Sequence, residues 1–119
     1  MSADAHRRVR PGEGQRLDLV FGALSDANRR QMLDAIMRDG STSVPVLTAQ
    51  LPITRQAVAK HLNVLGEAGL IQRQATAGRE VHYELTPDAL KTASSWVQAA
   101  DAAWAGRLSR LKQSLERTA

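Results

Sequence analysis

The chain has 119 residues, 43% of them hydrophobic and 3% aromatic, and this length suits one compact domain. It contains no cysteine, which excludes disulfides, iron–sulfur clusters, thiolate zinc sites and cysteine nucleophiles. Sixteen Lys and Arg against twelve Asp and Glu give a net charge of +4, so the expected partners are anionic, with nucleic acid ahead of membrane surfaces.

The first segment, residues 1–14, is predicted to be a disordered basic tail, because it is rich in Arg, Gly and Pro and has almost nothing to bury. Arg7, Arg8 and Arg10 lead into Pro11 and not into an apolar signal core. The chain also lacks the roughly 18 consecutive apolar residues of a membrane-spanning helix. We therefore expect no export signal or membrane anchor, and a cytoplasmic location.

Two helices are expected next. A short helix from about residue 15 carries an apolar face made of Leu17, Val20, Phe21 and Leu24. Ser25-Asp26 is expected to cap a second helix, which Gly40 ends. On this second helix the expected inward side chains are Met32, Leu33, Ile36 and Met37, and the expected outward ones are Arg29, Arg30 and Asp34.

A pair of short helices follows a brief extended link at residues 41–43. The apolar residues of the first are Val44, Leu47 and Leu51, and Pro52 ends it. Thr54 is expected to cap the second, which reaches about Ala68, ends at Gly69 and buries a stripe of Val58, Leu62 and Leu65. Two helices joined by such a tight turn predict a helix-turn-helix.

The pattern then changes to a period of two over residues 70–75 and 80–85, which predicts a β-hairpin with Gly78 at its tip. Val81, Tyr83 and Leu85 alternate there with Glu80, His82 and Glu84. Thr86-Pro87 is expected to open a last helix that runs nearly to the C-terminus. The predicted fold is mainly α with a small β-hairpin wing: a winged helix-turn-helix over residues 15–86, followed by a long dimerisation helix over residues 87–119.

The outward face of the helix from Thr54 to Ala68 carries side chains suited to reading DNA. Gln56 and Asn63 can pair with adenine edges, Lys60 with a phosphate or guanine, and Ala59 leaves room for a thymine methyl. The Thr54 hydroxyl and the helix N-terminus can hold a phosphate. The predicted DNA-binding residues are Thr54, Arg55, Gln56, Ala59, Lys60, His61, Asn63, Arg73 and Arg79.

Within this set, three side chains have more specific expectations. Arg73 and Arg79 lie on the hairpin, and Arg79 at its tip can enter a minor groove or touch the backbone. His61 lies toward the buried side of its helix, so we expect a half-packed, hydrogen-bonded histidine that can also touch a phosphate, and not a metal ligand.

Two segments together resemble the ArsR/SmtB family of winged-helix bacterial repressors. They are the run from Thr54 to Ile71, which contains His-Leu, a further Leu and Ala-Gly-Leu in that order, and the segment from Gly78 to Leu85. The segment from Phe21 to Asp26, with Arg29-Arg30 and Leu33, is similar to the opening helices of that family. The resemblance covers about residues 15 to 90. It implies a homodimer that sits on a double-stranded DNA operator with an inverted repeat and blocks transcription.

Many members of that family sense metals, but this sequence departs from them at both usual places. The segment from Ser43 to Thr48 has no thiol or imidazole, and the last helix has Asp88, Asp101 and Glu116 but no histidine. We therefore expect no metal and no cofactor. The chain resembles the metal-free branch, whose inducer is left open as a small molecule, a partner protein or concentration alone.

The last helix carries an apolar seam typical of helix pairing. Leu90, Val97, Trp104 and Leu111 are seven apart, and Leu108 and Leu115 fill the alternating positions. The expected dimer interface consists of Leu17, Val20, Phe21, Leu24, Leu90, Val97, Trp104, Leu108, Leu111 and Leu115. Trp96 and Trp104 are interpreted as packing residues, with a small-molecule pocket at the dimer interface as the alternative.

An enzyme and a protein-binding module are the two alternatives to a DNA-binding regulator. The sequence has no Gly-rich phosphate loop, nucleophile elbow or paired carboxylates at usable spacing, which argues against an enzyme. A winged helix that binds only another protein is the remaining alternative, since a fold does not fix its function.

Overall fold

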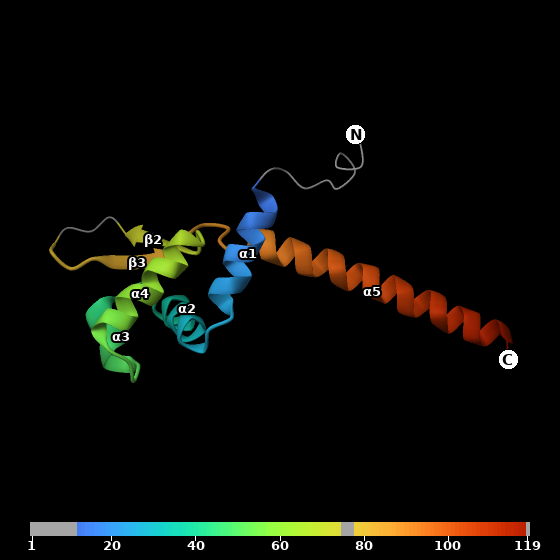
Figure 1. The fold of residues 1–119 in the computed structure, drawn as a ribbon, viewed down its shortest axis with the longest axis horizontal. Helices are drawn as coiled ribbons and strands as arrows, with labels where there is room; N and C mark the ends of the chain where they lie inside the picture. Colours follow the sequence, from blue (N-terminus) through green and yellow to red (C-terminus); the bar gives the residue numbers. More distant parts are fainter. Residues whose placement is uncertain (1–11, 75–77, 119) are drawn as a thin grey trace.

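The computed structural model of the chain describes residues 12–74 and 78–118. In chain order its elements are α1 (Glu13–Leu24), α2 (Ala27–Asp39), β1 (Thr42–Ser43), α3 (Val44–Gln50), α4 (Arg55–Glu67), β2 (Ile71–Gln74), β3 (His82–Leu85) and α5 (Lys91–Thr118). Figure 1 shows α1 to α4 and the strands gathered in one body, from which α5 projects as a long rod. The mainly helical fold with a small β wing is confirmed.

The limits of the N-terminal helix differ slightly from the prediction. Residues 1–11, which hold most of the predicted basic tail, lie outside the described residues, as do residues 75–77 in the wing. α1 already begins at Glu13, two residues before the expected start of structure at residue 15. No helix among the described residues is long and apolar enough to cross a membrane.

Side-chain caps and glycines set the helix ends where the sequence placed them. The Asp26 carboxylate accepts hydrogen bonds from the backbone N–H groups of Asn28 (2.8 Å) and Arg29 (3.2 Å), which are the free donors at the start of α2. α2 ends at Gly40, whose φ of +86° lies in the left-handed region that glycine adopts without strain. Gly69, with φ +77°, ends α4 in the same way.

The sheet has one strand more than the predicted hairpin. Its order is β1-β3-β2, and β3 pairs antiparallel with both neighbours. Thr42 and Ser43, expected to form only a link, lie opposite Tyr83 and His82. A two-residue strand shows no alternation of its own, and it becomes a strand because the open edge of β3 supplies its hydrogen-bonding partners.

The core lies between α1 to α4 and the sheet. Its buried hydrophobic side chains are Val20, Ala23, Met32, Leu33, Ala35, Ile36, Leu47, Val58, Leu62, Leu65, Leu70, Ile71 and Ala93. Two expected core residues are exposed: Met37 by 55% and Val81 by 40%. Met37 lies in the last turn of α2, at the rim of an apolar cavity of about 240 Å³, and Val81 precedes β3, whose residues are all half-buried, so the predicted alternation is incomplete.

The C-terminal helix begins later than predicted. Residues 87–90 form turns, and α5 starts at Lys91, because Asp88 adopts a φ of +58°, which a right-handed helix cannot contain. α5 then runs for 28 residues, a length of about 42 Å. Among its described side chains, Ala93 alone is buried, so nearly all of α5 lies beyond the core of the protomer.

Candidate nucleic-acid interface

The α4 helix presents two different faces. Val58, Leu62 and Leu65 are at most 2% exposed and fix the helix on the core. The Thr54 Oγ1 atom accepts a hydrogen bond of 3.1 Å from the N–H of Ala57, as expected for its N-cap. The opposite face is exposed along its length, and it carries Arg55, Gln56, Ala59, Lys60 and Asn63. The first acidic residue on α4 is Glu67, in its last turn.

The α3 helix packs against α4. Leu47 of α3 is 1% exposed, and Leu51 and Ile53 in the connecting turn pack against the core. Ser43 begins α3 by accepting a hydrogen bond of 3.3 Å from the N–H of Val46, with Pro45 in the first turn. The two helices therefore form the predicted helix-turn-helix, with α4 as the second and more exposed member.

The wing carries two exposed arginines. Arg73 lies on β2 opposite Tyr83 on β3, and Arg79 follows Gly78 in the connection between the strands. No carboxylate of the described residues pairs with Arg73, Arg79 or Lys60. The Glu80 carboxylate pairs instead with His82, whose Nε2 lies 3.0 Å from one of its oxygens. The cationic groups of α4 and the wing are therefore available for an anionic partner.

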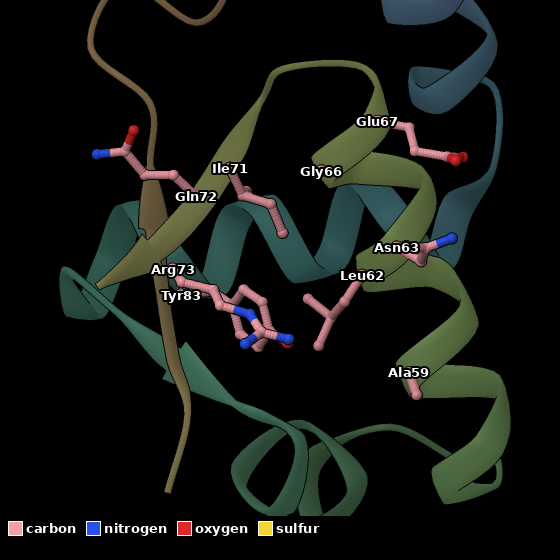
Figure 2. Close-up of a pocket in the computed structure, with 9 residues that line it drawn as sticks. All are labelled: Ala59, Leu62, Asn63, Gly66, Glu67, Ile71, Gln72, Arg73 and Tyr83. Carbon is pink, nitrogen blue, oxygen red and sulfur yellow. The ribbon is translucent and has the colours of Figure 1, made fainter. Parts of the chain in front are cut away.

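A groove separates α4 from the wing strands. It encloses about 490 Å³ and is lined by Ala59, Leu62, Asn63, Gly66, Glu67, Ile71, Gln72, Arg73 and Tyr83. Figure 2 shows Arg73 and Tyr83 close together and pointing from the strands toward Leu62, while Glu67 points away from the strands. Arg73 thus lies across the groove from Ala59 and Asn63, so residues predicted on α4 and on the wing line the same groove.

The sequence reasoning did not place Tyr83 and Gln72 at this site. The register of the hairpin explains the position of Tyr83. Tyr83 lies opposite Arg73, whereas Gln72 lies opposite Glu84 and donates a 2.8 Å hydrogen bond to its carboxylate. Because successive side chains of a strand point to opposite faces, Arg73 and Tyr83 share the groove face. This pairing could have been derived from the predicted hairpin if its register had been assigned.

His61 is half-buried and hydrogen-bonded, as the sequence indicated, but its partner was not foreseen. Its Nδ1 atom lies 3.2 Å from a terminal nitrogen of Arg29. Arg29 was expected to point outward, yet its side chain is only 15% exposed. It lies on the edge of α2 that faces both α4 and the end of α1, so contacts between elements, and not helical periodicity, decide its burial.

The charges around this contact also affect Asp26. Its partial burial favours a higher pKa, but hydrogen bonds from the N–H groups of Arg29 and Asn28, the charge that His61 carries when it is protonated and the charge of Arg29 lower the pKa below its ordinary value. Asp26 is therefore a stable carboxylate at the start of α2. In residues 12–74 and 78–118, no three or more His, Asp or Glu side chains are grouped so that they could hold a metal ion.

The residues of the expected dimer interface fall into two groups. Val20 is 3% exposed and is already buried in the protomer, while Leu17 and Leu24 are half-buried. The others are exposed by 38% to 63%: Phe21, Leu90, Val97, Trp104, Leu108, Leu111 and Leu115. Trp96 is 54% exposed and packs edge-on against Phe21, with ring centroids 5.8 Å apart. Neither tryptophan is a core residue of the winged domain.

Comparison with known proteins agrees with this geometry. Residues 24–74 match a family described as a helix-turn-helix domain. The chain is 43% identical over 60 residues to the HTH-type transcriptional regulator YuzN of Bacillus subtilis, which covers 45% of this chain and 65% of YuzN. It is 28% identical over 78 residues to the transcriptional repressor SdpR of the same organism, which covers 66% of this chain and 84% of SdpR.

Solved structures extend the likeness to almost the whole chain. An ArsR-like transcriptional regulator from Rhodococcus sp. RHA1 is 35% identical with a TM-score of 0.76, over 91% of this chain and 97% of that one. The homodimeric winged helix-turn-helix DNA-binding domain Mb0332 of Mycobacterium bovis has the same fold at 20% identity, with a TM-score of 0.62 over 85% of this chain and 92% of that one. From these matches and the geometry above, the chain belongs to the ArsR family of winged helix-turn-helix, DNA-binding transcriptional regulators.

Proposed function

We propose that the protein is a homodimeric repressor that binds an inverted-repeat operator through α4 and the wing, without a metal signal. The observation that carries the proposal is the exposed face of α4, which is polar, has no acid before its last turn and is held rigidly by three buried side chains on the opposite face. Rigid presentation matters because base recognition needs donors and acceptors in fixed positions.

Each side chain of this face has a distinct task in the proposal. Gln56 and Asn63 carry amides that donate and accept, and such amides pair with the N6 and N7 edge of adenine. Lys60 supplies a charge for phosphate or guanine, and Ala59 permits close approach of a thymine methyl. Thr54 and Arg55 stand at the N-terminus of α4, where free N–H groups and the helix dipole favour a phosphate.

The wing is assigned to the DNA backbone and the minor groove. Arg79 lies in the connection between the wing strands, and Arg73 lies across the groove from α4. Both side chains are exposed and have no carboxylate partner in the described part of the chain. A guanidinium so placed contacts phosphates or enters a narrow minor groove.

Dimerisation is inferred from α5. Val97, Trp104, Leu108 and Leu111 form an apolar stripe on a helix that leaves the core after Ala93, and each of the four is between 48% and 57% exposed. A contiguous apolar stripe of this kind requires a partner, and a twofold symmetric copy supplies it with the same stripe. The homodimeric state of Mb0332 supports this assignment. Two α4 helices would then enter major grooves one helical turn apart, roughly 34 Å.

Repression is favoured by the likeness to SdpR, which is described as a transcriptional repressor. A dimer seated on an operator blocks access to the DNA beneath it, and it needs no catalytic group to do so. We assign no cofactor to the protein. The inducing signal is proposed to be a small molecule, a partner protein or a change in the concentration of the regulator alone.

The proposal is tested by selecting duplexes from a random DNA pool with the full chain. An enriched inverted repeat with half-sites one helical turn apart supports the operator-binding dimer, and its affinity must fall steeply with rising salt. If no sequence is enriched, or if salt has no effect on binding, the DNA-binding proposal is wrong and a purely protein-binding winged helix replaces it.

Two substitutions then separate base reading from backbone contact. Gln56→Ala should lose discrimination at one base pair, by about 1 to 3 kcal/mol, while leaving the salt slope unchanged. Arg79→Ala should weaken binding to all sequences evenly and lower the salt slope by about one. Gln113→Ala, the same change as the first at an exposed position of α5, serves as the control and should alter neither quantity.

A further inference from the structure

The half-buried Arg29 of α2 forms a bridge between three elements. The Nε atom of Arg29 donates to the carbonyl of Ala23 (2.8 Å), one terminal nitrogen donates to the carbonyl of Gly22 (3.1 Å), and the other lies 3.2 Å from Nδ1 of His61. Gly22 and Ala23 lie in the last turn of α1, and His61 lies in the middle of α4. One side chain therefore joins the end of α1 to the helix proposed to read DNA.

This bridge uses properties that only arginine combines. The last carbonyls of a helix have no partner inside that helix, and Arg29 donates to two of them, those of Gly22 and Ala23. The Gly22 carbonyl also accepts from the N–H and the hydroxyl of Ser25. The guanidinium is planar and has five donors in a fixed fork, so it can serve two carbonyls and a ring nitrogen at the same time. A lysine ammonium at the same place could not hold these three acceptors in one plane.

The contact also fixes the state of the histidine. A guanidinium can only donate, so the Nδ1 atom of His61 must accept the hydrogen bond. The ring proton then resides on Nε2, which makes that atom a donor, the kind of group that a DNA phosphate oxygen accepts. His61 is half-buried, and its neighbours along α4 are Lys60, which is exposed, and Leu62, which is 2% exposed and part of the core.

The other end of the bridge reaches the helix proposed to dimerise. Phe21 immediately precedes the two carbonyls that Arg29 holds, and its ring packs edge-on against Trp96 of α5 with an interplanar angle of 74°. Contacts therefore run without a gap from α5 through the last turn of α1 to Arg29 and His61. A rigid chain of this kind can transmit a displacement of α5 to α4.

We propose that Arg29 is a positioning residue for DNA reading: through His61 it fixes α4 relative to α1 and α5, and it selects the histidine tautomer that presents a donor. This proposal rests on the proposed function, because it concerns how the DNA-reading helix is held. It predicts that operator affinity depends on Arg29 although Arg29 lies behind the reading face of α4.

Arg30 provides a matched control for Arg29. It is the next residue of α2, it carries the same charge, and it also donates to a carbonyl at the end of α1, that of Leu24, at 2.5 Å. None of the hydrogen bonds among the described residues joins it to α4. Comparing Arg29→Gln with Arg30→Gln therefore cancels the loss of one charge and of one hydrogen bond to the end of α1. The remaining differences are the contact with His61, a second carbonyl of α1 and the 4.0 Å ion pair with Asp26, and the His61 variants isolate the first of these.

The experiment measures binding of each variant to the duplex that the parent selects from a random pool. Arg29→Gln should lower affinity by about tenfold, and Arg30→Gln should keep it within about twofold. His61→Phe, which removes the acceptor, should lower affinity as well. The double variant Arg29→Gln/His61→Phe should bind the duplex no more weakly than whichever single variant has the lower affinity. His61→Gln, whose side-chain oxygen can accept, should retain more affinity than His61→Phe.

A spectroscopic readout tests the bridge without DNA. Nitrogen-15 NMR of the parent should show the His61 proton on Nε2, and Arg29→Gln should give a mixture of the two tautomers. Thermal unfolding and the oligomeric state are followed for each variant. If Arg29→Gln does not fold, two other measurements test the positioning role. They are the affinity of Arg29→Lys, which keeps the charge, for the selected duplex, and the tautomer of His61 in the parent.

The outcomes separate the two proposals. Failure of the parent to enrich any duplex contradicts the proposed function. If a duplex is enriched but the Arg29 and Arg30 variants bind it equally well, or the Arg29 and His61 effects add in full, the positioning role is wrong. A parent histidine with its proton on Nδ1 also overturns it.

Discussion

Replacing one leucine of the α5 stripe should weaken the proposed dimer. The loss of dimerisation free energy depends on how much of that leucine is exposed in the protomer and covered in the dimer. Leu111 is 57% exposed in the protomer. Full burial of a leucine side chain stabilises by about 2 kcal/mol, so covering the exposed part contributes about 1 kcal/mol per copy. A twofold dimer contains two copies, and Leu111→Ala should cost about 2 kcal/mol. This corresponds to a rise of about 30-fold in the dissociation constant of the dimer.

Sedimentation equilibrium over a dilution series measures that dissociation constant for the parent and the variant. Alanine favours helix formation, so the helical content of α5 by circular dichroism should not fall. Gln113→Ala, at an exposed position of the same helix two residues away, is the control and should leave the constant unchanged. An equal dissociation constant for parent and Leu111→Ala would refute the assignment of this stripe to the dimer interface.

Three further predictions concern stability. Leu65 lies on the buried face of α4 and has no exposed surface. Leu65→Ala should therefore lower the free energy of unfolding by about 2 to 5 kcal/mol in urea titrations, and a loss below about 1 kcal/mol would contradict the packing described. Gly106→Ala should stabilise α5 by about 0.8 to 1 kcal/mol in thermal unfolding, since the added methyl group meets only the end of Arg110 at 3.5 Å. The pKa of Asp26 is lowered in the folded chain, so its stabilisation is present above the ordinary pKa of about 3.9 and is lost as pH falls through the lower folded value. Asp26→Asn should therefore make acid destabilisation less steep below about pH 4, and an unchanged slope would show that the lowered pKa has no part in it.

The proposed DNA interface depends on how firmly α4 is held, and the two proposals meet there. Buried apolar contacts of Val58, Leu62 and Leu65 fix its depth on the core, and these contacts are not directional. The hydrogen bond between Arg29 and His61 is directional, so it also fixes the rotation of α4 and the tautomer of His61. We expect the first set to govern stability and the second to govern affinity for DNA.

Local chemistry determined most of the fold from the sequence alone. The Thr54 cap, the stripe at Val58, Leu62 and Leu65 and the glycine at position 69 each act within one helix, so the bounds of α4 and its exposed face followed from helical periodicity. The apolar repeat on α5 was visible for the same reason. These features need no knowledge of what the rest of the chain does.

The tertiary structure decided what depends on distant segments. β1 exists because β3, some 40 residues later, offers an edge, and Arg29 is partly buried because His61, 32 positions away, lies beside it. At Pro87, a local helix-start pattern gave way to the left-handed turn at Asp88, which delays α5 to Lys91. Periodicity tells which side chains share a face, but only the packed chain tells which other element that face meets.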